Sequence, residues 1–164
     1  MKNKKTWEEV ENLMVREIKD LNDNTQFLKT KGFIQHGDVT VYEHCIMVMV
    51  KSCEIAYRLK ADVDYSKLIK GALLHDYFLY DWHDNDSSHR LHGFSHPRKA
   101  YENARRDTVL SELEGDIIRH HMFPLTIIPP QSKEAWIVCM ADKICATKET
   151  LHMEDLIASK FISV

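Results

Sequence analysis

Apolar residues recur at helical spacing through most of this chain. At its start, Thr6 and Glu9 have the spacing of a capping box, and the pattern that follows predicts a helix over residues 6–29. The apolar positions of this helix are Val10, Leu13, Met14, Ile18 and Leu21. A turn region near Gly32 and Gly37 precedes a second predicted helix at residues 39–60. That helix is apolar except along the stripe Glu43, Met47, Lys51, Glu54 and Arg58, so it should be well buried.

Two more helices should follow, separated by a loop. Ser66 should open the first of them, which carries the dipeptide His75-Asp76 near its end. Ser95 should cap the second, whose first turn begins at His96 and Pro97. Residues 81–95 between them are polar and rich in turn-forming residues, which predicts a loop.

The last third of the chain is also helical in pattern. Ser111 and Glu114 form another capping box, which should open a short helix that Pro124 ends. After Pro130 a long helix should begin and extend as far as the C-terminus. No strand alternation and no internal repeat is found, so the sequence predicts an all-α, single-domain helical bundle over residues 1–164.

Composition narrows the class of protein. The chain is 44% hydrophobic and 29% charged, as in ordinary globular proteins. Its net charge of −3 and lack of a basic stripe give no support for binding a nucleic-acid polymer. No segment has the length of a membrane span or the pattern of a signal peptide, and the four cysteines form no CxxC pair. We therefore expect a cytoplasmic protein without a membrane partner, whose N-terminal helix either docks on the bundle or forms a homodimer contact.

Ten histidines direct attention to metals, and several polar residues share helix faces with apolar ones. His44 is in register with Val41 and Val48, and Asp76 with Ala72. His121, Asp142 and His96 have similar settings. A single such histidine is more often a hydrogen-bonded core residue than a ligand, and Asp142 alone could pair with Lys143, Lys148 or Arg119. Several together in a helical bundle instead suit one or two transition metals, Fe, Mn, Co, Ni or Zn, with Fe or Mn favoured.

The order His44, His75-Asp76, Asp142 resembles the signature of the HD-domain superfamily of metal-dependent phosphohydrolases. The resemblance covers about residues 38–150, and the run from Gly71 to Asp76 is especially similar. It implies that one metal takes His44, His75, Asp76 and Asp142. In two-metal members a second metal takes two further histidines, here His96 and His121, with Asp76 as the bridge. His120 is the alternative to His121, or a substrate contact.

Hydrolysis of a phosphate ester or anhydride, in a nucleotide or related small molecule, is the activity this resemblance implies. Asp76 would be catalytic as the bridge, and His120 or a histidine of the 81–95 loop (His83, His89 or His92) could donate the leaving-group proton. Many members have a lysine soon after the His-Asp pair, whereas this chain continues with Tyr77-Phe78-Leu79-Tyr80. Phosphate would then be met by other cations, with the candidates Arg90, Arg98, Lys99 and Lys143.

Two alternatives stay open. A branch of the same superfamily uses a mixed-valent di-iron pair and O2 to cleave C–C or C–P bonds, and the missing lysine is compatible with that chemistry. A non-catalytic regulatory module could also retain the fold, although such a module would be expected to have lost some ligands.

Overall fold

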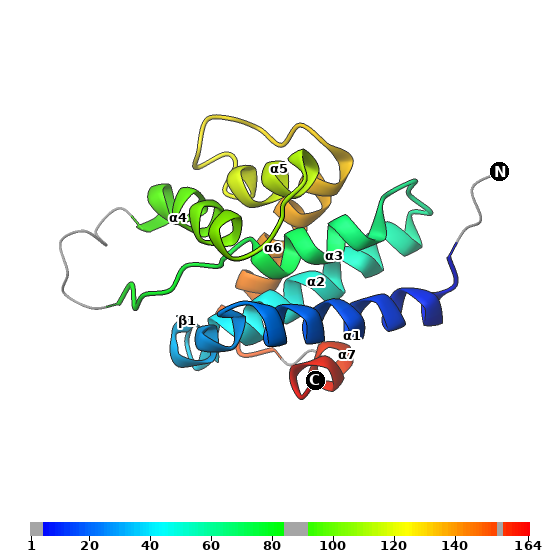
Figure 1. Cartoon of the computed structure of the whole chain (residues 1–164), viewed down its shortest axis with the longest axis horizontal. Coiled ribbons are helices and arrows are strands. Elements are labelled where there is room, and N and C mark those ends of the chain that lie inside the picture. The colour runs from blue at the N-terminus through cyan, green and yellow to red at the C-terminus, as the bar shows by residue number, and fades with distance from the viewer. Residues whose placement is uncertain (1–4, 84–91, 154–155) are drawn as a thin grey trace.

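The computed structural model describes residues 5–83, 92–153 and 156–164, and its described part is a bundle of helices (Figure 1). The all-α prediction is confirmed. The helices are α1 (Trp7–Asn24), α2 (Val41–Arg58), α3 (Tyr65–Leu74), α4 (His92–Asp107), α5 (Glu112–His120), α6 (Lys133–Thr150) and α7 (Leu156–Ile162), with a 3-10 helix η1 (Phe27–Gly32). No helix in the described ranges combines the length and the apolar character needed to cross a membrane.

The centre of the bundle is α2, which packs on α3 and α6. The short helix α5 packs on α3, α4 and α6, and it lies on the opposite side of α2 and α3 from α1 and α7 (Figure 1). The predicted apolar face of α1 docks on the bundle, since Val10, Met14, Ile18 and Leu21 are fully buried. The four cysteines are also buried and form no disulfide.

Capping residues explain several helix starts. Thr6, Thr40 and Ser111 each form a complete capping box with the glutamate three residues later. The N-terminal helix is shorter than predicted, because Thr25 adopts an extended conformation and the chain continues into η1.

Two predicted starts are wrong. Asp64, not Ser66, caps α3 by accepting from the backbone N–H of Lys67. The helix α4 begins at His92 and not at His96, so Pro97 lies inside it and removes one backbone hydrogen bond. His96, Pro97 and Ala100 are buried, and this burial offsets the lost bond.

The sequence pattern also missed two features near turns. A two-stranded antiparallel hairpin, β1 (Ile34–His36) and β2 (Val39–Thr40), turns at Gly37, whose φ of +57° suits glycine. Its strands are too short to show an alternating pattern. The last predicted helix does not reach the C-terminus, because α6 ends at Thr150 and His152 takes a left-handed φ of +53°.

Candidate metal centre

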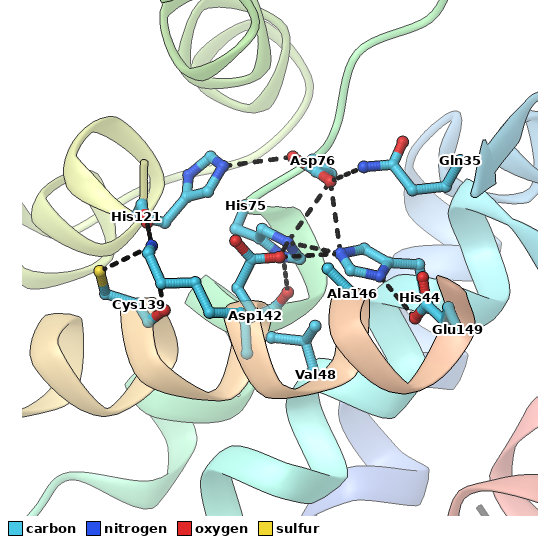
Figure 2. Close-up of polar contacts among 12 residues, drawn as sticks. Gln35, His44, Val48, His75, Asp76, His121, Cys139, Asp142, Ala146 and Glu149 are labelled. Atoms are coloured by element: carbon cyan, nitrogen blue, oxygen red, sulfur yellow. Dashed lines mark hydrogen bonds and ion pairs between the residues drawn. The ribbon is translucent and has the colours of Figure 1, made fainter. Parts of the chain in front are cut away.

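The six predicted ligands lie together in the interior. Five elements supply them: His44 on α2, the pair His75-Asp76 directly after α3, His96 on α4, His121 directly after α5, and Asp142 on α6. None is more than 8% exposed. Figure 2 shows five of these side chains pointing toward one another. The contacts divide into two groups, which we call the first and the second group.

The first group consists of His44, His75 and Asp142. The Nε2 atom of His44 lies 3.0 Å from Oδ1 of Asp142 and 3.3 Å from Nε2 of His75. The same carboxylate oxygen lies 3.6 Å from Nε2 of His75. The described contacts of the Asp142 carboxylate are therefore with histidines. They do not include the alternative partners Lys143, Lys148 or Arg119.

The second group consists of His96 and His121, whose Nε2 atoms are 2.9 Å apart. Asp76 lies between the two groups. Its Oδ1 is 3.1 Å from Nε2 of His96 and 3.3 Å from Nε2 of His121. Its Oδ2 is 3.5 Å from Nε2 of both His44 and His75. Each oxygen of one carboxylate thus faces a different pair of imidazoles.

The outer ring nitrogens fix which atoms point inward. The Nδ1 atoms of His44, His75 and His121 lie 2.7 Å from Oε1 of Glu149, 2.7 Å from the Ala72 carbonyl and 2.8 Å from the Ile118 carbonyl, respectively. These oxygens only accept, so each Nδ1 carries the proton and donates it. When these rings are neutral, as metal ligation requires, the Nε2 atoms that face the centre are the nitrogens with free lone pairs.

This donor set fits a bound cation. Two Nε2 lone pairs only 3.3 Å apart repel each other unless positive charge lies between them. Oδ1 of Asp76 is buried and makes no hydrogen bond to the described residues, although two imidazole nitrogens adjoin it. The ligand atoms of His44, His75 and Asp142 all lie within 4.8 Å of one another, as do those of His75, Asp76 and His121. Imidazole and carboxylate ligands together suit divalent transition metals.

The charges of the centre are strongly coupled. Burial lowers the pKa of His44, but hydrogen bonds with Asp142 and Glu149 outweigh burial and raise the pKa to about 10. Burial raises the pKa of Asp76, and the positive charges of His75 and His96 outweigh it, holding the pKa well below its usual range. The carboxylates thus favour the presence of positive charge, which protons or metal ions can supply.

Three residues next to the centre were not predicted from the sequence. Gln35 donates from Nε2 to Oδ2 of Asp76 at 2.6 Å, and Glu149 accepts from His44. The ring of His36 lies edge-on to that of His44, with centroids 5.8 Å apart. Glu149 lies seven residues after Asp142, two turns along the same helix face, which is a signal that could have revealed it. Gln35 offers no such signal, because the hairpin brings it to the centre.

The other predicted site residues lie in varied places. His120 donates from Nδ1 to Oδ1 of Asp116 at 2.6 Å, and the structure brings His121, not His120, to the centre. Lys143 donates to the carbonyls of His121 and Cys139. The remaining predicted cations differ in setting. Arg98 pairs with Glu102 at the surface, and Lys99 lies over the Tyr80 ring at 4.4 Å.

Part of the predicted loop lies outside the described residues, including Arg90 and His89, and the side chain of His92 is likewise not described. His83 is described, and its backbone N–H donates to Asp81 beside it.

The residues directly after His75-Asp76 are core residues. Tyr77 and Phe78 are fully buried. The Tyr77 hydroxyl donates to Asp107 at 2.7 Å and accepts from the backbone N–H of Gln26 at 2.8 Å. Tyr77 therefore anchors the pair to α4 and to the residue that precedes η1.

Fold and site together define an all-α protein with a buried, two-part histidine–aspartate centre suited to divalent metals. Residues 41–147, more than half of the chain, match the family model described as HD domain, and the chain belongs to this family. The HD domain is characteristic of the metal-dependent phosphohydrolase superfamily, whose members are mostly hydrolases that bind divalent metals. Neither the curated proteins nor the solved structures contain a match to this chain.

Proposed function

We propose that this protein hydrolyses a phosphate ester or anhydride of a small molecule, such as a nucleotide, at a centre of two divalent metals. The observation that carries the proposal is the division of Asp76, whose Oδ2 faces the first group while Oδ1 faces the second. A carboxylate shared in this way is the expected bridge between two cations. When bound, the two metals supply an activated water and stabilise the charge that develops on the phosphoryl oxygens.

The residues of the chain then have distinct tasks. His44, His75 and Asp142 would hold one metal together with Oδ2 of Asp76. His96 and His121 would hold the other together with Oδ1. Asp76 would fix the spacing of the pair, which is the sense in which it is catalytic. Nitrogen and oxygen donors without thiolate suit Fe, Mn, Co, Ni or Zn, and Fe or Mn remain the metals we favour.

Proton transfer is assigned to His120 in this proposal. Asp116 holds the ring at Nδ1 and also accepts from the backbone N–H of Gln131 and the hydroxyl of Ser132, so the carboxylate is itself fixed. Such anchoring would leave Nε2 of His120 as the nitrogen that exchanges a proton with the leaving group.

Among the predicted phosphate-binding cations, Lys99 is the best supported. It lies on α4 three residues after His96, on the same side of the helix, and it is only partly exposed. Arg98 is 84% exposed at its side chain and paired with Glu102, which makes it a weaker candidate. Lys143 would contribute mainly by holding the end of α5 through the His121 carbonyl.

The test begins with metal analysis of protein purified without chelators or added metal. Two equivalents of a transition metal are expected. The same preparation is then screened for phosphate release from nucleotides and phosphomonoesters. In parallel, oxygen consumption is measured with reduced, iron-loaded protein. Metal-dependent phosphate release supports the proposal. Oxygen consumption without phosphate release would favour the oxygenase alternative, and a protein that binds no metal would favour a regulatory module.

A further inference from the structure

Glu149 contacts the outer edge of His44, on the side of the ring that points away from the centre. It lies near the end of α6, is 4% exposed, and accepts from Nδ1 of His44 at 2.7 Å (Figure 2). Its contact is therefore with the outer side of a ligand, and any effect on a metal must pass through the His44 ring.

Glu149 differs in charge from the groups that orient His75 and His121. His75 and His121 are oriented by backbone carbonyls, which are neutral, so orientation alone requires no charge. Moreover, Oε2 of Glu149 is buried and has no hydrogen-bond partner among the described residues. Burying a carboxylate in this way is unfavourable unless its charge has a use.

The use that fits this geometry is electronic. A carboxylate that accepts from the Nδ1–H of an imidazole makes Nε2 of the same ring more basic and therefore a stronger metal ligand. A second neighbour acts on the same side of the centre, because Gln35 holds Oδ2 of Asp76, the oxygen that faces the first group. As a donor, Gln35 orients this oxygen without making it more basic, so the electronic effect on the first group comes from Glu149.

We propose that Glu149 is a positioning residue that acts through His44 to make the first group the tighter of the two metal positions. The inference rests on the two-metal centre of the proposed function. It adds that the positions are unequal and fill in order, and that one buried glutamate sets a large part of the difference.

The experiment titrates metal-free protein with Co²⁺ and follows binding by calorimetry and by the visible absorption of the bound ion. Wild-type protein should bind two equivalents with distinct Kd values. In Glu149→Gln, which keeps an acceptor but loses the charge, the tighter Kd should rise about 10-fold to 100-fold. The weaker Kd should change less than about 2-fold, and the absorption of the first equivalent should shift.

Glu134→Gln is the matched control. Glu134 is also a buried glutamate of α6, 6% exposed, but it accepts from the backbone N–H of Asp64, away from the centre. Both Kd values and the absorption should stay at wild-type values in this variant. Glu149→Asp, which keeps the charge but withdraws it from His44, provides the test if Glu149→Gln does not fold, and it should also weaken the tighter site.

The outcomes are distinguishable. If wild-type protein binds no Co²⁺, the proposed function itself fails. If wild-type protein binds two equivalents and the Glu149 variant that folds binds them equally well, the inference is overturned. Equal weakening of both sites would also overturn it, since that result indicates general loosening of the bundle.

Discussion

Asp76 is the residue on which both groups depend. Among the described residues it is the one carboxylate that contacts both groups, so we expect Asp76→Ala to retain at most one equivalent of metal. Phosphate release should fall by at least about 100-fold, because removing even an outer partner of a ligand costs about 10-fold to 100-fold. Metal analysis and the phosphate-release assay check this prediction. Asp81→Ala, at an exposed aspartate nearby, should leave both quantities unchanged. Full metal content and turnover in Asp76→Ala would refute the bridging role.

Asp107, which accepts a hydrogen bond from the Tyr77 hydroxyl, should make the stability of the fold depend on pH. Its hydrogen bond with Arg106 is the main reason why its pKa falls to about 2, and the hydrogen bond from the Tyr77 hydroxyl lowers the pKa further. Burial raises the pKa of this carboxyl but is outweighed. The unfolded pKa is about 4, so this group stabilises the fold above about pH 4 and loses its effect as the pH falls toward 2. The urea midpoint of Asp107→Asn should therefore lie below that of wild type at pH 7.

The difference between the two midpoints should shrink as the pH falls from about 4 toward 2, where Asp107 becomes protonated in the wild type too. A difference that is the same at every pH would show that the side chain contributes by packing alone. Comparing midpoints between the two proteins cancels the titration of the other carboxylates, which both share.

The six candidate ligands could be singled out from sequence because each is a polar residue in helical register with apolar neighbours. His44 and Asp142 are clear examples, and the family resemblance supplied their grouping. The partners outside the ligand set were less accessible. Gln35 reaches Asp76 across 41 residues of chain, and no local pattern encodes that contact. Lys143 was predicted as a substrate contact, and nothing in the sequence indicated that it also donates to the carbonyl of His121, because tertiary packing sets the position of that carbonyl.

At the scale of elements, Gly71 lets α3 and α5 approach closely. A Cβ atom at this position would lie 2.5 Å from Cδ1 and 3.0 Å from Cβ of Ile117. Gly71→Ala should therefore reduce the free energy of unfolding by about 1–3 kcal/mol, although alanine is the better helix former by about 1 kcal/mol. Denaturant unfolding measures the effect.

Gly32→Ala is the control for this prediction, because a Cβ atom there meets nothing within 4 Å. Its stability should stay at or above that of the wild type. Since His75 follows α3 and His121 follows α5, separating the two helices should also weaken metal binding. Gly71→Ala with wild-type stability would show that Ile117 can move aside at little cost.

Helix boundaries were predicted well where the cap is local and poorly where packing decides. Thr6 and Ser111 combine a capping side chain with a glutamate three residues on, and both start helices as predicted. Ser66 and Ser95 are capping residues by type, but other residues nearby can start the helix equally well. In the second case the burial of His96 and Pro97 extends α4 backward past the serine.

At the scale of the whole molecule, the ligands lie between residues 44 and 142 of the chain and meet only in the folded state. A metal that binds the folded state raises the free energy of unfolding by about 2.7 kcal/mol at 100 times its Kd. Adding Mn²⁺ or Co²⁺ to metal-free protein should therefore raise Tm with concentration, and a chelator should reverse the increase. A Tm independent of both additions would contradict metal binding by the fold. Asp76→Ala should show a smaller increase than wild type.

The arrangement of helices around α2 could not be derived from periodicity. Apolar faces indicate that α1 and α2 pack, but not that α5 contacts α3 closely enough to require Gly71. The short hairpin and the break at His152 also depend on backbone conformations that single residue types only favour.

Burial of the centre has a consequence for how this protein can diverge. Asp76, Asp142 and Glu149 occupy interior volume that apolar side chains would otherwise fill. Losing one member leaves the others as uncompensated buried polar groups, which costs about 3–5 kcal/mol when an ion pair is broken, whereas replacing a whole set by apolar residues is often neutral or stabilising. Descendants that abandon the centre should therefore lose these residues in groups, and they should be more stable without metal than a protein that keeps the centre.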